Sequence, residues 1–108
     1  MRFSSAKSSG HLTANTIVYS GKCFLTGVQL FADATNAATL VVYDSGTAST
    51  SRKILFKGIA NAEGGGGTGS SYETKDWTYP IEADLGIYVV VSGTGCGFVA
   101  EYIPDIGG

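Results

Sequence analysis

Charge is scarce in this chain of 108 residues. Lysine, arginine, aspartate and glutamate together make up 15% of it, against roughly 25% in an ordinary globular domain. The 7 basic and 9 acidic side chains leave a net charge of -2, which argues against a nucleic-acid-binding surface, because such a surface needs clustered lysine and arginine. A monomer keeps its surface solvated largely with charge. The deficit therefore indicates either a surface rich in Ser, Thr and Gly or a surface covered by partners.

Side chains that carry chemistry are also few. His11 is the single histidine, and it lies in a polar stretch beside Ser9 and Gly10 that cannot hold it against a nucleophile. One histidine excludes a multi-histidine metal site, and Cys23 and Cys96 alone do not complete a zinc site. The cysteines lack the CxxC spacing that would support a redox pair or disulfide, so we expect two buried thiols. The sequence predicts no enzyme, no cofactor and no metal.

Long hydrophobic runs are missing. No segment approaches the ~18 apolar residues that a membrane-spanning helix requires. The stretch MRFSSAKSSGHLTANT lacks the continuous apolar core of a signal peptide. We therefore expect synthesis in a cytoplasm and no association with a membrane.

Short segments of β composition, separated by turn residues, fill most of the chain. Residues 1–15 are polar and predict a flexible or partner-ordered N-terminal arm, and residues 16–108 predict a single domain. No window shows the apolar stripe and caps of a helix. The fold class is therefore all-β, an antiparallel β-sandwich that is jelly-roll-like, with about seven to eight short strands. The expected strands are 16–20, 22–32, 37–44, 53–60, 75–82, 86–92 and 96–103.

The stretch GIYVVVSGTGCGFVAEYI, at 86–103, begins with a strand that is apolar on both faces. Its one charged side chain is Glu101. A strand of this kind is central in its sheet or is covered by another subunit. We expect one face to fill the sandwich, and Tyr88 and Val90, with Phe98, to contact a copy of the chain or another partner.

Two patterns imitate functional motifs. The Gly64–Gly69 loop formally matches GxGxxG, but a strand-like segment follows where a phosphate site needs the start of a helix. Glu82 and Asp84 could form a catalytic carboxylate pair, yet both lie near a turn, where acids are ordinarily solvated. A calcium site built on them lacks ligands. We interpret the first as a loop and the second as surface charge.

The segment DWTYP, at 76–80, suggests a binding site. Trp77 and Tyr79 alternate along the expected strand and so project from one face, with Tyr72 close in sequence. Pro80 cannot donate to a sheet ladder, which places this strand at an edge. The favoured interpretation is that the rings pack in the core or in a contact between subunits. The alternatives are contact with another surface partner and stacking on carbohydrate.

Three phrases carry a family resemblance: YSGKCFLTGVQLFAD, NAATLVVYDSGTAS and ADLGIYVVVSGTGCGFVAEY. Through them the chain, over most of residues 17–103, resembles small virion proteins of tailed bacteriophages, of the capsid decoration (cement) and head-fibre type. The shared motifs are strand-and-turn phrases, and the family has no catalytic residues to transfer. The resemblance implies a jelly-roll-like sandwich, commonly trimeric, that lies on the outer capsid surface and clamps neighbouring major capsid subunits. The glycine-rich loop at 64–69 departs from the family pattern.

Composition and resemblance together predict a non-enzymatic virion structural protein. The expected partners are the chain itself, as a homotrimer, and the phage major capsid protein. The expected location is the outer capsid surface of the virion. The alternatives are a tail or fibre-base adaptor of the same fold and a carbohydrate-binding module for host attachment. The candidate contact residues are Tyr72, Trp77, Tyr79, Tyr88, Val90 and Phe98, together with Arg2 and Lys7 of the arm.

Overall fold

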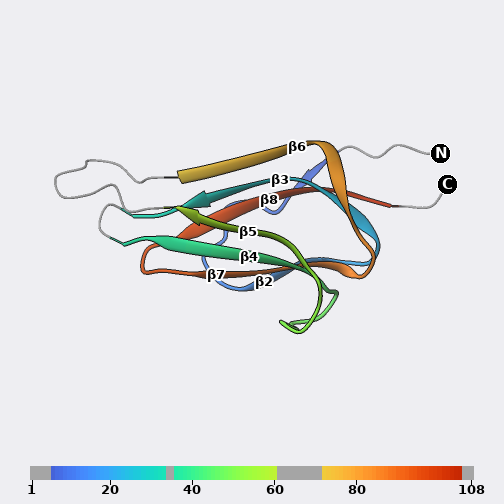
Figure 1. Ribbon diagram of the computed structural model, residues 1–108, viewed down its shortest axis with the longest axis horizontal. Helices are drawn as coiled ribbons and strands as arrows, with labels where there is room; N and C mark the ends of the chain where they lie inside the picture. The colour runs from blue at the N-terminus through green and yellow to red at the C-terminus, as the bar shows by residue number, and fades with distance from the viewer. Residues whose placement is uncertain (1–5, 34–35, 61–71, 106–108) are drawn as a thin grey trace.

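Two antiparallel sheets of four strands each pack face to face (Figure 1). The computed structural model describes residues 6–33, 36–60 and 72–105. These residues contain no helix, and so none that could span a membrane. The predicted all-β sandwich is confirmed. Its strands are β1 (Lys7–Ser8), β2 (Thr16–Ser20), β3 (Cys23–Phe31), β4 (Ala38–Asp44), β5 (Ile54–Ala60), β6 (Tyr72–Ala83), β7 (Gly86–Ser92) and β8 (Gly97–Pro104).

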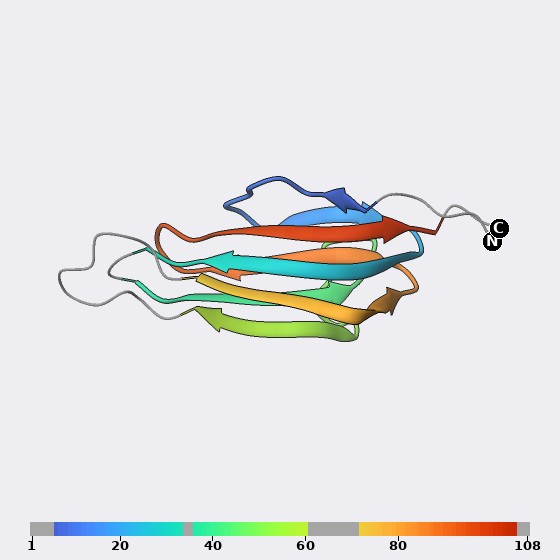
Figure 2. The same cartoon turned by 90° about the horizontal axis from the view of Figure 1, so that it is seen from above.

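The strand order is that of a jelly roll. One sheet has the order β1-β8-β3-β6, which Figure 2 shows from above, and the other has the order β2-β7-β4-β5. The pairs β1 with β8, β2 with β7, β3 with β6 and β4 with β5 are all antiparallel. The chain is therefore one long hairpin, with its tip between β4 and β5, wrapped around a core. This wrapping assigns successive pairs to alternate sheets, which is the double Greek key of a jelly roll.

The N-terminal segment is held by the domain's own backbone. β1 pairs with β8, and the Ser9 amide donates to the Ala100 carbonyl oxygen at 2.8 Å. Leu12 and Phe98 exchange two backbone hydrogen bonds of 2.9 and 2.8 Å. Part of the predicted arm thus covers an edge of β8 whose backbone N–H and C=O groups would otherwise be unpaired. Lys7 lies exposed on β1, and Arg2 lies outside the described residues.

The core lies between the sheets and is built from alternate residues of each strand. Phe98 is fully buried, because the register sets it opposite the buried Leu30 and aligns Ala100 with Val28. This candidate contact residue therefore fills the interior and does not reach a partner. The largest fully buried side chains are Phe98, Leu25, Leu30, Leu40, Ile87, Val42 and Val89.

A buried carboxylate joins the end of β4 to the turn between β6 and β7. The side chain of Asp44 accepts hydrogen bonds from the backbone amides of Asp84 at 3.1 Å, Leu85 at 2.8 Å and Gly86 at 3.4 Å. Gly86 has a φ of +147°, and a Cβ at this position would collide with the Tyr19 carbonyl oxygen. Only glycine fits there. The carboxylate and the glycine together fix where β7 begins.

Both cysteines are buried free thiols, as predicted. Cys23 begins β3 opposite Pro104, whereas Cys96 precedes Gly97, which lies opposite Phe31 at the other end of β3. The length of β3 separates the two thiols, on the order of 27 Å at ~3.4 Å per residue. A disulfide needs Cα atoms within about 7 Å of each other, so this fold excludes one between them.

Replacing Asp44 should destabilise the fold. Asp44→Ala leaves the buried Gly86 amide and the partly buried Asp84 and Leu85 amides without their acceptor, and an unsatisfied buried donor costs roughly 1–3 kcal/mol. We expect the free energy of unfolding to fall by about 3 kcal/mol, measured by urea denaturation. Asp84→Ala, which removes an exposed neighbouring carboxylate, is the matched control and should change little. Equal unfolding midpoints for the two variants would contradict this role.

The Cys23 thiol should make stability depend on pH. Burial, helped by the nearby Asp44 carboxylate, raises the pKa of Cys23 from 9.0 to about 11. The folded state then holds this proton more tightly than the unfolded state, so the contribution is present below pH 9 and is lost as the pH rises toward 11. Denaturation series should show a steeper loss of stability over this range for the wild-type chain than for Cys23→Ala. Parallel curves would contradict the prediction.

Candidate functional site

The outward surface of the β2-β7-β4-β5 sheet is apolar. Along the two central strands, Val41, Tyr43, Tyr88 and Val90 alternate with core residues and therefore face away from the other sheet. The edge strands add isoleucines to the same surface. We call this surface the outer face. Its residues are Ile17, Thr39, Val41, Tyr43, Ile54, Lys57, Ile59, Tyr88, Val90 and Ser92.

Stacked tyrosines occupy one end of the outer face. Tyr43 on β4 lies opposite Tyr88 on β7, and their rings stack with centroids 6.2 Å apart and planes 29° apart. Ile17 of β2 lies beside Tyr88 and Ile54 of β5 lies beside Tyr43. The result is an apolar strip that crosses all four strands of the sheet.

The exposed apolar area comes from the edge strands. Ile17, Ile54 and Ile59 keep 42%, 50% and 57% of their surface exposed, whereas Tyr88 keeps 8%. Val90 is half-buried. Neighbours within the chain therefore cover most of Tyr88. The surface that a partner could bury is supplied mainly by the three isoleucines, which the sequence analysis missed.

One of these isoleucines could have been found from the sequence. Lys57 indicates which side of β5 faces solvent, and Ile59, two residues further, shares that side. Ile54 breaks this parity because the pairing of β4 with β5 shifts register between Val42 and Tyr43. A register shift of this kind has no clear signature in a single sequence.

Charge is nearly absent from the outer face. Lys57 is its one charged member, with Arg52 and Lys53 exposed just before β5. The other sheet differs, because it exposes the charged side chains of Glu82 on β6 and Glu101 on β8. A contiguous apolar surface with a polar rim is typical of an interaction site.

A bulge interrupts β6 where the aromatic segment lies. In the pairing of β3 with β6, Leu25 is opposite Ile81 while Gly27 is opposite Asp76. Residues 77–80 therefore lie opposite Thr26 alone. A bulge of this size turns side chains out of the regular alternation.

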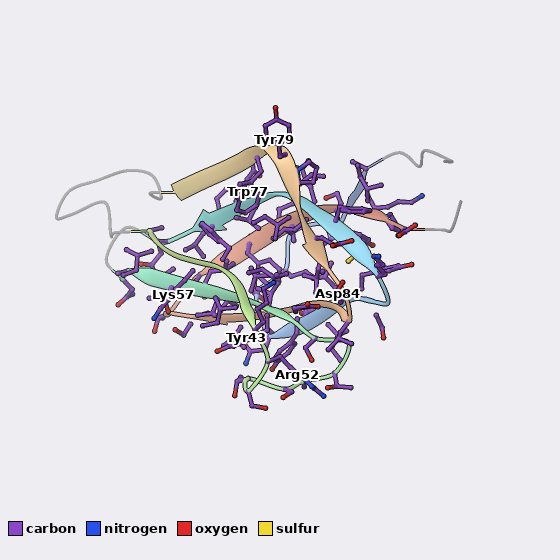
Figure 3. The ribbon with its side chains drawn as sticks, turned by 45° about the vertical axis from the view of Figure 1, so that its right-hand side comes forward. Tyr43, Arg52, Lys57, Trp77, Tyr79 and Asp84 are labelled. Carbon is purple, nitrogen blue, oxygen red and sulfur yellow. The ribbon has the colours of Figure 1, made fainter. Side chains whose placement is uncertain are left out.

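The bulge separates the two aromatic rings that the sequence placed on one face. Trp77 is half-buried and meets Phe56 of β5 edge-on, with centroids 5.3 Å apart and planes 81° apart. Tyr79 is 86% exposed and projects away from the sandwich (Figure 3). The expectation of one shared face was therefore wrong. The side chain of Tyr72 lies outside the described part of the structure.

A small hollow lies at the β5 side of the outer face. It has a volume of about 200 Å³ and is lined by Thr39, Lys57, Gly58 and Ile59. Sites for drug-sized ligands measure roughly 300–1,000 Å³, whereas an engineered cavity of ~150 Å³ holds benzene. The hollow therefore has room for a single aromatic ring.

The candidate carboxylate pair is part of surface charge. Glu82 forms an ion pair with Lys22, with 3.2 Å between the carboxylate oxygen and Nζ. The hydrogen bond and charge of Glu82 raise the pKa of Lys22, and Asp105 and Asp84 add to the effect. Across residues 6–33, 36–60 and 72–105, no group of three or more His, Cys, Asp and Glu side chains could hold a metal ion.

His11 packs against the sandwich. Its ring meets Phe31 edge-on at 5.6 Å and occupies the space over Gly97, where a Cβ would collide with it. This contact is hydrophobic packing and includes no nucleophile. The Gly64–Gly69 loop lies outside the described residues.

Comparison of the chain with protein-family models, curated proteins and solved structures found no significant match.

Proposed function

We propose that this chain is a non-enzymatic structural protein of a phage virion, a capsid decoration protein that forms a homotrimer and binds the outer shell. The observation that carries the proposal is the outer face, an apolar sheet surface with Lys57 as its one charged member. The resemblance of the strand-and-turn phrases to decoration proteins supports the virion assignment.

The outer face has the properties of the centre of a protein–protein interface. The buried centre of such interfaces is depleted of charged residues and enriched in aromatic ones. Here the stacked Tyr43 and Tyr88 lie between the exposed Ile17 and Ile54 at one end of the face, and the exposed Ile59 lies toward its other end. Burial of apolar surface stabilises an assembly by about 25 cal/mol per Å². Stable interfaces bury on the order of 1,600 Å² in total.

Decoration works by adding buried area to an existing shell. A protein that bridges neighbouring shell subunits forces expansion or internal pressure to break its own contacts as well as theirs. Each contact is modest, but the symmetry of a shell repeats it in every equivalent position. This role needs no catalytic site, because binding alone stabilises the shell.

The carbohydrate-binding alternative is the weaker one, because the two rings on which it relies do not share a face. It required Trp77 and Tyr79 to present a paired aromatic platform, and Trp77 instead packs edge-on against Phe56. A tail or fibre-base adaptor would use the same outer face, and only its position on the particle would differ.

Light scattering combined with a head-binding assay tests the proposal. The wild-type chain should have the mass of a trimer and should bind saturably to mature heads that lack it. Ile59→Asp places a charge in the outer face and should raise the apparent dissociation constant of the trimer at least tenfold, or about 1.4 kcal/mol.

Leu85→Asp is the matched control, because Leu85 is 45% exposed in the β6–β7 turn and lies off the outer face. It should leave both the mass and the head binding unchanged. A wild-type chain that stays monomeric and ignores mature heads would refute the proposed function.

A further inference from the structure

Among the described residues, the most exposed large hydrophobic side chain lies on a bulge whose backbone is constrained on both sides. Tyr79 is 86% exposed at the bulge of β6. Trp77 anchors one side of this bulge by its edge-on contact with Phe56 at 5.3 Å. On the other side, Pro80 restricts the backbone through its ring. The backbone that carries the ring is thus restrained, and the ring itself projects outward (Figure 3).

The hollow on the outer face is open to solvent and large enough for a phenol ring. Its volume of about 200 Å³ exceeds the ~150 Å³ that holds benzene. Ile59 supplies an apolar wall, Gly58 contributes backbone alone, and the ammonium of Lys57 can donate to a phenolic oxygen. The hydroxyl of Thr39 is already bonded to Ser92 at 2.6 Å.

The ring and the hollow of one chain cannot meet. Tyr79 projects from β6 away from the sandwich, whereas Lys57 lies on β5, which belongs to the other sheet (Figure 3). The two features therefore occupy different surfaces. A contact between them joins two copies through unlike surfaces, and contacts of this type close into rings when the rotation between copies allows.

We infer that Tyr79 of one copy inserts into the hollow lined by Thr39, Lys57, Gly58 and Ile59 of the next copy. This inference rests on the proposed function, which supplies a closed ring of three copies. A phenol is neutral, so it leaves Lys57 with a hydrogen-bond acceptor and brings no like charge to it. A two-fold contact of outer face on outer face would bring the Lys57 side chains of both copies into the same interface, where like charges repel.

Two variants with complementary defects test the inference. Tyr79→Ala removes the ring and keeps the hollow, whereas Thr39→Phe fills the hollow and keeps the ring. Each alone should raise the dissociation constant of self-association at least tenfold in sedimentation velocity. An equimolar mixture should form a heterodimer, because one intact ring and one intact hollow remain in each pair.

Controls separate a lost contact from a lost fold. Tyr79→Phe keeps the ring and should assemble within tenfold of the wild-type chain, and Leu85→Ala, at an exposed site elsewhere, should assemble as the wild type does. Circular dichroism should show the same β signal for every variant. These results would support insertion of the Tyr79 ring.

The possible failures are distinct. If the wild type assembles and both Tyr79→Ala and Thr39→Phe assemble equally well, the inference is wrong while the proposed function stands. The same holds if the two variants are monomeric alone and remain monomeric when mixed. If the wild type neither assembles nor binds mature heads, the proposed function fails with it.

Discussion

The side-chain parity of β4 and β7 determines both the core and the outer face. Leu40, Val42, Ile87 and Val89 fill the space between the sheets, and the residues between them must then face outward. A slip of one residue would exchange the two sets completely. The hydrogen bonds from the β6–β7 turn to Asp44 prevent this slip, because they tie the end of β4 to the start of β7. The candidate interaction surface is thus a consequence of how the core is registered.

Parity also explains which features the sequence could predict. Alternation and turn residues placed β2 and β7 at their observed bounds, and a charge-poor, all-β chain pointed to the jelly roll. Ile59 could have been assigned from Lys57. The bulge at 77–80 could not be predicted, because it depends on how β6 pairs around Thr26 of β3, a strand distant in sequence. That bulge decides that Trp77 turns inward and Tyr79 outward.

The N-terminal segment shows a second limit of local pattern. Its residues are polar and have weak strand propensity, so composition predicted an arm. What orders residues 7–12 is the open edge of β8, whose backbone groups need partners that the sequence of the segment itself does not reveal. Asn15 continues this attachment, since its side-chain oxygen accepts a hydrogen bond from the Val91 amide at 2.9 Å. Pairing demand from elsewhere in the fold overrides local propensity here.

The low charge of the chain has two structural expressions. The loop between β4 and β5 exposes the hydroxyl groups of Thr47, Thr50 and Ser51 to water, beside the charged Arg52 and Lys53. The outer face, in contrast, exposes isoleucine and has few groups that water can solvate well. A surface rich in hydroxyls accounts for the first region and needs no partner. It cannot account for the second, where Ile54 beside the stacked tyrosines and Ile59 toward the other end are both about half exposed. A bound surface is the arrangement that removes this apolar area from water.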